Sequence, residues 1–408
     1  MREYVSIEEA VTSLLGEVSP AGTETVSIAD ANRRVLAEDI AACVDLPPFH
    51  RSAYDGFALR SADTQSASKE KPIRFPVIGM IAAGDFWTET LPSGCAVRIM
   101  TGAPLPEGAD CVINFERVTE EGDAIYLPVT LSPWQNVDKK GDELQAGTPL
   151  LCAGELLTPA HLGVLASQGI AKVSVYRKPR AAILSTGTEL LSPGTALQPG
   201  KIYNSNLYVL RALLEQEGYE VGDCIHMQDD EQSICETLRR LSESNDLILT
   251  TGGASVGDKD FALNALEQVG ADVLFARVRM KPGSCTFGAK LGKALAVSFS
   301  GNPGAALTAY YRVVLPAIRK LAGRRDCTLH ERMLPIQGGY RKSCPSPRIL
   351  KGHTETVGGV TCFVAHDGQK NGMQTSFLRM DALAELPPMD APLAEGTLVR
   401  VFFPEVKG

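Results

Sequence analysis

The middle of the chain alternates between strand-like and helix-like patterns, and this alternation constrains the fold more than any other feature. Short apolar runs are separated, for the most part, by segments with helical periodicity. Alternating strands and helices predict a three-layer α/β domain with a largely parallel sheet. We place this domain at 179–323. The strand runs are Ala181–Leu184, Val221–Met227, Asp246–Thr250, Val273–Val278 and Ala294–Phe299, and the helical segments are 206–217, 230–242, 258–269 and 303–321.

The regions on either side of this domain have different patterns. Residues 1–45 open with a capping box, Ser6 to Glu9, and together with 136–178 they predict a discontinuous helix-and-strand domain. Residues 46–135 are rich in Pro and Gly and contain short alternating runs, which predict an inserted β-rich domain built from hairpins. Residues 324–408 alternate as strands do, so the expected fold class is α/β plus β, closed by a small β domain.

Composition narrows the class of protein. The chain has 408 residues, too many for one ordinary core. No apolar run reaches membrane-spanning length, and the N-terminus has no signal-peptide core. The 10 cysteines form no CxxC pair, which indicates reduced thiols in a cytosolic protein. The net charge of −8 argues against general nucleic-acid binding. We therefore expect a cytoplasmic protein with no membrane or nucleic-acid partner.

One segment, 246–261, combines a buried strand, a glycine turn and a helix start. The turn is Thr250-Thr251-Gly252-Gly253, and Asp258 and Asp260 precede the helical pattern. This layout presents backbone N–H groups to a phosphate or another oxyanion. Two carboxylates would repel such a ligand unless a divalent metal ion bound with it. The alternative is a tight turn whose acidic residues cap the helix.

Other predicted strands of this domain also end in polar, glycine-rich segments. Ligands of open α/β sheets bind beyond the carboxyl ends of the strands. Lys281 is suited to meet a phosphate as a point charge, and Pro303, in the first turn of a helix, leaves outward-facing N–H groups. Asp229 is suited to cap the following helix, and capping is the simpler explanation for it. Because five such ends share one edge, we expect a joint anion site there. The segments are 185–189, 226–230, 250–261, 280–283 and 300–304.

The β-rich domain contains two further polar turns. Asp55 lies in the turn of 49–58, between aromatic flanks, and Thr101 ends the strand of 98–104. Ordinary turn chemistry explains both segments when each is taken alone.

Together these motifs resemble the MoeA / gephyrin E-domain family, the molybdopterin molybdenumtransferases. The resemblance runs from about residue 5 to the C-terminus in one register. It implies an elongated protomer of four domains, with a molybdopterin-binding-like α/β domain and a barrel-like C-terminal domain. It also implies a homodimer whose active site lies between the α/β domain of one subunit and the β-rich domain of the other. The matching segments are SAYDGFA (52–58), RIMTGAPLPEGAD (98–110), STGTEL (185–190), TTGGASVGDKDF (250–261), MKPG (280–283) and SGNPGAALT (300–308).

The resemblance implies a reaction, partners and site residues. The reaction is insertion of molybdate into adenylylated molybdopterin with release of AMP, assisted by a divalent cation such as Mg²⁺. The implied partners are the upstream molybdopterin adenylyltransferase and the proteins that accept the finished cofactor. Cleavage of a phosphoanhydride requires neutralised charge and fixed donors, which suits the motifs. The catalytic residues implied are Asp55, Thr101, Glu189, Asp229 and Asp258, of which Asp55, Glu189, Asp229 and Asp258 would hold the metal, and the binding residues are Gly252, Gly253, Ser255, Asp260, Lys281, Ser300 and Pro303.

The chain departs from the family pattern at several of these motifs. Thr188 replaces an Asp, Ser284 and Cys285 stand where a second Lys-Pro is usual, Ser300 replaces a Pro, and Asp138 stands where an Arg opens a basic stretch. The site loses positive charge and rigid prolines. Three alternatives follow: an active enzyme with weaker oxyanion binding, an enzyme for a related oxyanion or pterin, or a paralogue that binds without turnover or acts as a scaffold. An adenylyltransferase would leave the β-rich domain unexplained.

Overall fold

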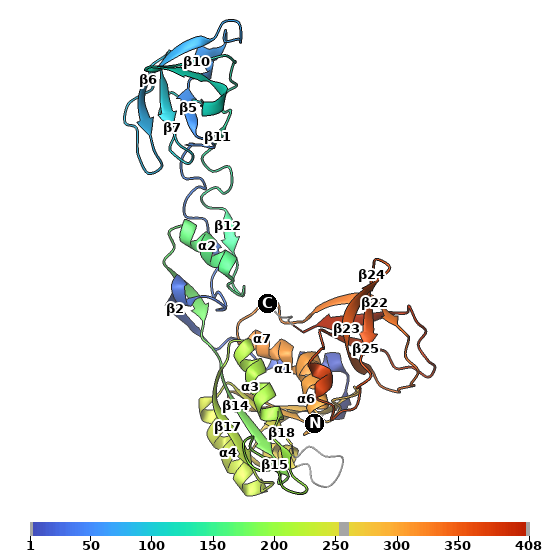
Figure 1. Cartoon of the computed structure of the whole chain (residues 1–408). Coiled ribbons are helices and arrows are strands. Elements are labelled where there is room, and N and C mark those ends of the chain that lie inside the picture. The colour runs from blue at the N-terminus through green and yellow to red at the C-terminus, as the bar shows by residue number, and fades with distance from the viewer. Residues whose placement is uncertain (1–2, 253–260, 405–408) are drawn as a thin grey trace. The chain divides into compact units, whose positions relative to one another are not determined.

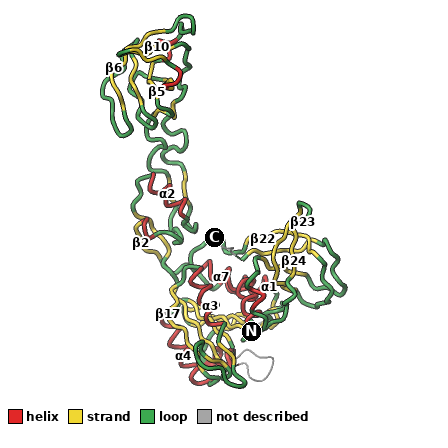
Figure 2. Tube along the Cα trace, viewed as in Figure 1, coloured by secondary structure: helices red, strands yellow, loops and turns green. Residues whose placement is uncertain are grey.

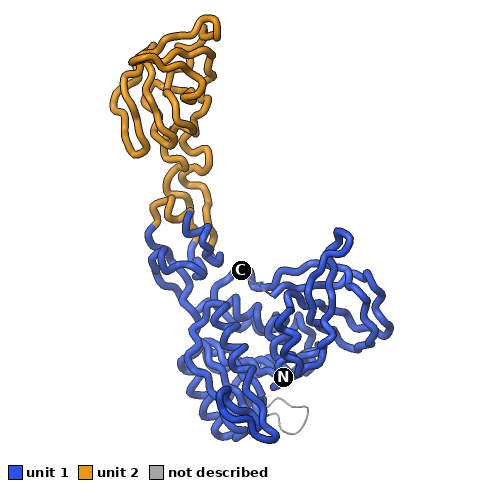
Figure 3. The backbone as a smooth tube through the Cα atoms, viewed as in Figure 1, with its two compact units in different colours: residues 1–38, 153–163, 171–408 blue, residues 39–152, 164–170 orange. Residues whose placement is uncertain are grey.

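The computed structural model describes residues 3–252 and 261–404, and it divides into two compact units (Figures 1 and 3). The larger unit comprises Met1–Glu38, Ala153–Gly163 and Ala171–Gly408, and the smaller unit comprises Asp39–Cys152 and Val164–Ile170. No helix in the described ranges is long and apolar enough to cross a membrane.

A seven-stranded sheet forms the centre of the larger unit. Its order is β1-β19-β20-β21-β18-β14-β17, and β14 runs parallel to both β17 and β18, while β18 runs parallel to β21. This confirms the predicted α/β domain. The strands are β1 (Glu3–Val5), β14 (Arg180–Thr186), β17 (Glu220–Met227), β18 (Leu247–Thr251), β19 (Asp272–Val278), β20 (Phe287–Leu291) and β21 (Ala294–Phe299).

Two strands of this sheet were not predicted. β1 adds a parallel edge strand from the N-terminus, and β20 runs antiparallel to β19 and β21. β20 joins β21 through the two-residue turn Gly292-Lys293, with Gly292 at a positive φ of 58°, as hairpins favour. β20 has only five residues, and two of them, Gly288 and Lys290, are of types depleted in strands, which hid it. As a result β20 separates the carboxyl end of β19 from that of β21.

Helices cover both faces of the sheet, which gives the expected three layers. Alternate residues of β14 face opposite sides: Ile183 belongs to one core cluster and Leu184 to the other. The first cluster contains α1 (Ile7–Gly16), α3 (Asn206–Gln216) and the helix that begins at Pro303. The second contains α4 (Glu231–Ser244) and α5 (Phe261–Gln268).

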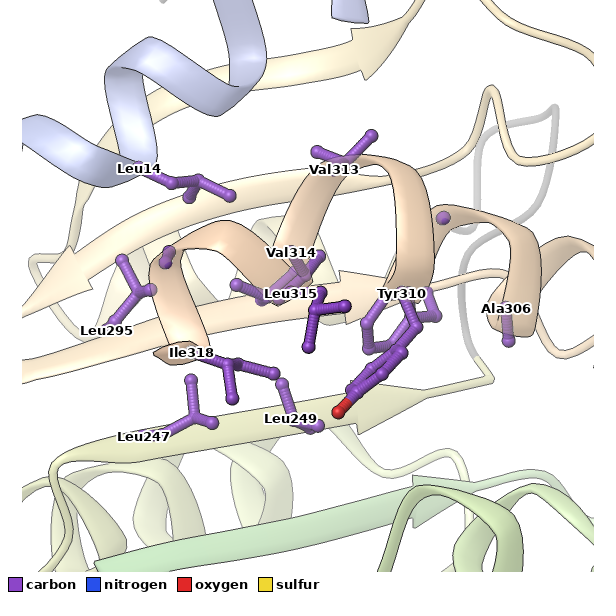
Figure 4. Close-up of a cluster of buried hydrophobic side chains, with 14 of the residues drawn as sticks. Leu14, Leu247, Leu249, Leu295, Ala306, Tyr310, Val313, Val314, Leu315 and Ile318 are labelled. Atoms are coloured by element: carbon purple, nitrogen blue, oxygen red, sulfur yellow. The ribbon is translucent and has the colours of Figure 1, made fainter. Parts of the chain in front are cut away.

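The predicted helix at 303–321 is present but is not uniform. It consists of α6 (Pro303–Ala309), a π-helical turn at Tyr310–Val314 and α7 (Leu315–Leu321). Pro316 lacks an N–H group and its ring would collide with the carbonyl four residues earlier in a regular α-helix, which accounts for the wider turn. Tyr310 and Ile318 pack over Leu247 and Leu249 of the sheet (Figure 4).

The N-terminal segment and its partners complete this part of the unit. The predicted capping box is present, because the Ser6 N–H donates to Glu9 (2.7 Å) and the Glu9 N–H donates to Ser6 Oγ (3.1 Å). α1 packs into the first core cluster through Leu14. β2 (Thr23–Ser27) pairs with β13 (Lys172–Tyr176). α2 spans Pro159–Ser167, and its residues from Val164 onward belong to the smaller unit. The division into four domains stays a prediction.

The C-terminal region is a closed five-stranded barrel, which confirms the predicted β domain (Figure 1). Ile336, Leu350, Phe363 and Val401 belong to its core. The strands, in barrel order, are β22 (His330–Gln337), β24 (Val360–Ala365), β23 (Arg348–Val357), β25 (Ala382–Leu386) and β26 (Leu398–Phe403).

An ion pair joins the barrel to the π-helical turn. Arg312 Nε lies 3.0 Å from Glu385, and its guanidinium lies 3.6 Å from the ring centroid of Phe402. The side chains of Arg312 and Glu385 are only 12% and 14% exposed.

The smaller unit contains a six-stranded sheet and little helix (Figure 2), as predicted for the inserted β-rich domain. Phe57, Phe75 and Ile113 belong to its core. The sheet strands, in order, are β8 (Cys111–Asn114), β5 (Gly56–Leu59), β7 (Ala96–Ile99), β6 (Ile73–Ile81), β10 (Ala124–Leu127) and β9 (Thr119–Glu121), and the pairs β4 (Arg51–Ser52) with β11 (Val137–Asp138) and β3 (Ile40–Ala41) with β12 (Pro149–Leu151) form short ladders.

Substitution of Glu385 by alanine tests the link between barrel and helix. It leaves a nearly buried guanidinium without its carboxylate, so we expect the free energy of unfolding to fall by roughly 3 kcal/mol. Urea denaturation followed by far-UV circular dichroism measures this free energy. Tryptophan fluorescence would not report unfolding of the larger unit, since Trp87 and Trp134 both lie in the smaller unit.

The control for this experiment is Glu215→Ala. Glu215 pairs with Arg211 on the surface of α3, where the two side chains are 49% and 51% exposed. We expect this variant to lose no more than about 0.5 kcal/mol. Equal losses in the two variants would show that Glu385 contributes no more than a surface pair.

Candidate functional site

A cavity of about 880 Å³ lies beyond the carboxyl ends of β14, β18 and β21 in the larger unit. Its position agrees with the prediction from the strand-end motifs. Five of the predicted site residues line it: Glu189, Asp229, Gly252, Ser300 and Pro303.

The floor of the cavity depends on a close approach between two strand ends. Gly252 has a φ of 91°, and a Cβ atom built on it would lie 2.0 Å from the carbonyl oxygen of Thr186. Only glycine allows this approach, which brings the turn after β18 against the end of β14.

Asn206, the first residue of α3, ties the other strand ends together. Its Nδ2 donates to Thr251 Oγ1 (2.8 Å) and to the carbonyl oxygen of Gly301 (3.0 Å). Asn206 is 8% exposed and lines the cavity. It was not predicted from the sequence, where its only sign was an amide side chain at the end of the polar run 204–206.

Three buried oxygen atoms around the cavity lack hydrogen-bond partners. They are Ser185 Oγ, Thr186 Oγ1 and Asp229 Oδ1. Across the described part of the chain, 7 buried side-chain nitrogen or oxygen atoms lack a partner, so nearly half of them gather here. Each such atom costs roughly 1–3 kcal/mol if it stays unpaired, which indicates a ligand that completes them.

The residue that caps α4 is Asp230, so capping does not explain Asp229. The carboxylate of Asp230 accepts a hydrogen bond from the Ser233 N–H (2.9 Å), and hydrogen bonding by Ser233 holds the pKa of Asp230 below its usual value. The sequence suggested that Asp229 caps α4, but the structure assigns the cap to the next residue, Asp230. Asp229 is left to face the cavity.

The start of α6 is only partly available to a ligand. Pro303 occupies the first turn, as predicted, and Ser300 Oγ accepts a hydrogen bond from the Asn302 N–H (3.3 Å). The Gly304 N–H, however, donates to the carbonyl oxygen of Asn371 (2.7 Å) in the C-terminal region. One of the predicted outward-facing donors is thus already used.

The C-terminal barrel supplies part of the cavity wall. The barrel strap, defined as residues 366–378, contributes Gly372 and Gln374, and Gln374 Nε2 donates to Ser205 Oγ (2.8 Å). Nothing in the sequence of this region indicated a role, because the strap has no charged or catalytic motif at the wall.

A buried lysine fixes the barrel strap from the inside. The Nζ of Lys351 lies 3.4 Å from the carbonyl oxygens of Lys370 and Met373, and 4.8 Å from the ring centroid of Phe377. Lys351 is 2% exposed, and its burial lowers its pKa.

The described lining of the cavity is acidic. It includes Glu189 and Asp229 but neither Lys nor Arg. Lys201, next in the chain to the lining residue Ile202, donates from Nζ to the carbonyl oxygen of Thr188 (2.6 Å). Over the described ranges, no group of three or more His, Cys, Asp or Glu side chains is arranged to hold a metal ion.

Lys281 is not among the residues that line the cavity. Its N–H donates to the carbonyl oxygen of Pro347 (2.9 Å), and its own carbonyl accepts from the Ile349 N–H (2.8 Å), so its backbone pairs with the start of β23. Its role in anion binding stays a prediction. Four other predicted residues, Gly253, Ser255, Asp258 and Asp260, lie outside the described residues.

Asp55 and Thr101 lie together in the smaller unit. One carboxylate oxygen of Asp55 accepts hydrogen bonds from the Thr101 N–H (2.7 Å) and from Thr101 Oγ1 (2.8 Å). The backbone hydrogen bond, followed by that of the hydroxyl, holds the pKa of Asp55 below its usual value. Asp55 is exposed, so a rigid, ionised carboxylate faces outward from this unit.

Comparison with known proteins agrees with this geometry. Two family models match the chain: "MoeA N-terminal region (domain I and II)" over residues 5–169 and "Probable molybdopterin binding domain" over residues 182–320.

The chain is 34% identical over 404 residues to the molybdopterin molybdenumtransferase of Staphylococcus aureus, a match that covers 99% of this chain and 96% of the relative. It is also 34% identical over 405 residues to the protein of the same name from Staphylococcus epidermidis, with the same coverage. The crystal structure of the molybdopterin biosynthesis MoeA protein from Pyrococcus horikoshii superposes with a TM-score of 0.84 at 29% identity, over 98% of this chain and 100% of that one. The chain therefore belongs to the molybdopterin molybdenumtransferases, a transferase family of molybdenum cofactor biosynthesis.

Proposed function

We propose that this protein inserts molybdate into adenylylated molybdopterin with release of AMP, in a reaction assisted by a divalent cation. The observation that carries the proposal is the charge of the cavity: two carboxylates, and neither Lys nor Arg in its described lining. A phosphoanhydride and an oxometalate cannot rest against Glu189 and Asp229 unless a cation lies between them. The three unpaired buried oxygen atoms support a ligand at the same place.

The donors present suit Mg²⁺. All of them are oxygen atoms, and Mg²⁺ is usually held by one or two carboxylates together with substrate phosphates and several waters. Glu189 and Asp229 would hold it, with Asp258 as a third proposed ligand. Mg²⁺ supplies charge neutralisation on the phosphoanhydride and on the departing AMP.

The chain's own residues position the substrate. The Gly252 turn lets backbone approach the pyrophosphate closely, because no side chain intervenes. Asn206 holds the ends of β18 and β21 at a fixed spacing, which keeps the donors in place as charge develops. We assign the remaining binding roles to Ser300, Pro303 and Lys281, and to Gly253, Ser255 and Asp260.

We also propose that the protein is a cytoplasmic homodimer with a shared site. Each smaller unit would present Asp55 and Thr101 to the larger unit of the partner subunit. The support is local: the Asp55 carboxylate is fixed by two hydrogen bonds and exposed. The upstream adenylyltransferase would deliver the substrate, and cofactor acceptor proteins would receive the product.

A non-catalytic or specialised binding protein is the second candidate. It is favoured by the absence of a basic side chain from the described cavity lining, which leaves a bound oxyanion without a cationic side chain. Tight binding of adenylylated molybdopterin without AMP release in the presence of Mg²⁺ would select this candidate.

Substitution of Asp229 by asparagine tests the catalytic assignment. We expect AMP release and cofactor formation to fall by roughly 10²-fold, since one of the carboxylates proposed to hold the divalent cation is lost. The dependence of the remaining rate on Mg²⁺ concentration should also weaken. The assay follows AMP and molybdenum cofactor formation from purified substrate and molybdate.

Asp230→Asn is the matched control for that variant. Its carboxylate caps α4 and does not line the cavity, so this substitution should leave turnover within about two-fold while costing at most about 1 kcal/mol of stability. Normal turnover by Asp229→Asn would remove Asp229 from the catalytic residues.

Mixing two inactive variants tests the shared site. If Asp55 acts on the partner's cavity, a dimer of one Asp55→Ala subunit and one Asp229→Asn subunit contains one intact site. Free subunit exchange should then restore about one quarter of the wild-type activity, since half of the dimers are mixed and each has one of two sites. Each variant alone should stay inactive.

Failure to recover activity in a mixture shown to contain mixed dimers would place both residues in one chain's site. A stable monomer in sedimentation would contradict the dimer itself.

A further inference from the structure

A second cavity adjoins the first and has the opposite character. The apolar groove, as we call it, has a volume of about 370 Å³ and lies between α3, α6 and the barrel strap. It contains no charged side chain in its described lining. Its apolar walls are Val209, Leu210, Ala306, Leu307, Phe377 and Leu378.

The two cavities share one boundary. Asn206, Pro303 and Gln374 line both of them. These three residues mark the line at which a polar, acidic cavity gives way to an aliphatic and aromatic one. A ligand that spans this line has one polar end and one apolar end.

The boundary offers a directed polar contact. Gln374 donates through Nε2 to Ser205 Oγ (2.8 Å), which fixes its amide. Its Oε1 accepts no hydrogen bond from any described residue, so it is available to an N–H group at the edge of the groove. Asn206 is fixed by its two bonds to Thr251 and Gly301.

The groove is open to a ligand from solvent. Val209 is 41% exposed and Leu378 is 76% exposed. Contact with a ligand would remove this apolar surface from water. A volume near the lower limit for ligand sites suits a single ring system better than a longer apolar chain or a peptide segment.

We propose that the apolar groove holds a flat, uncharged heteroaromatic ring of a ligand whose phosphate lies in the adjoining polar cavity. A ring of this kind packs against leucine and phenylalanine side chains, and an exocyclic amino group at its edge donates to Gln374 Oε1. This inference rests on the proposed function, whose substrate carries two such rings, adenine and pterin, on either side of its phosphates.

The experiment measures binding of three probes by calorimetry in the presence of Mg²⁺. AMP carries the purine ring, neopterin phosphate carries the pterin ring, and ribose 5-phosphate carries neither. The test variant is Val209→Trp, which fills the groove from an exposed position on α3. Ala212→Trp is the matched control, since Ala212 is exposed on the same helix and does not line the groove.

We expect Val209→Trp to weaken the binding of at least one ring-bearing probe by about ten-fold or more, because the indole blocks the ring from the groove. This is the size of one lost stacking contact. Ribose 5-phosphate should bind the variant within about two-fold of the wild type, and Ala212→Trp should bind all three probes normally. If Val209→Trp loses binding of AMP alone, the groove holds adenine. If it loses binding of neopterin phosphate alone, the groove holds the pterin. Loss of both shows that either ring can enter.

Three results would overturn the proposal: equal weakening of all three probes, no weakening of either ring-bearing probe, or no binding of either ring-bearing probe to the wild-type protein. Turnover of adenylylated molybdopterin separates this proposal from the proposed function. If the protein turns over its substrate but Val209→Trp does not change the binding of the ring-bearing probes, the groove proposal alone is wrong. If Val209→Trp weakens the binding of a ring-bearing probe but the wild-type protein shows no turnover, the proposed enzymatic function alone is wrong.

Discussion

The close contact between Gly252 and the carbonyl of Thr186 is the constraint on which the site depends. It brings the turn after β18 to the end of β14, and no residue with a Cβ could occupy the position without moving one strand. Asn206 then holds the end of β18 to the turn after β21. The cavity is therefore defined by the spacing of three parallel strands, which gives it a rigid base.

The unpaired oxygen atoms and the negative charges in the cavity walls determine which ligands the cavity can bind. Two hydroxyl oxygens and one carboxylate oxygen are buried without partners, while the charges present are negative. Structural polar groups in a folded core are normally paired, so this arrangement has a cost that a bound ligand would offset. The neighbouring Asp230 is the contrast, because its carboxylate is fully explained by the helix that it caps.

Features that depend on residues close together in the chain could be predicted from the sequence, whereas features that depend on distant partners could not. Local patterns gave the strands and helices of the α/β domain, the capping box at Ser6 and the β character of the inserted and C-terminal regions. β20 was missed because it is short and contains Gly288 and Lys290, residue types that are depleted in strands. Asp229 was considered as the cap of α4, whereas the cap is the next residue, Asp230.

Asn206 and Gln374 could not be predicted, since their importance comes from partners 45 and 169 residues away in the chain. Amide side chains carry no catalytic motif, and the barrel strap meets the cavity only after both domains have folded. The π-helical turn was equally hidden. Regular and widened helices share the same apolar spacing over one turn, and a single proline did not reveal which would form.

That widened turn has a consequence for how the family can vary. It accommodates one extra residue within an otherwise continuous helix. A homologue that lost one of the residues 310–314 could close the wide turn into a regular α-helix, and the helix beyond it would keep nearly the same rotation about its axis. Ile318 would then still face the sheet, whereas the side chains within the turn would change direction and Arg312 would leave Glu385. The wide turn is therefore the place where this helix can lose one residue without losing its contact with the sheet.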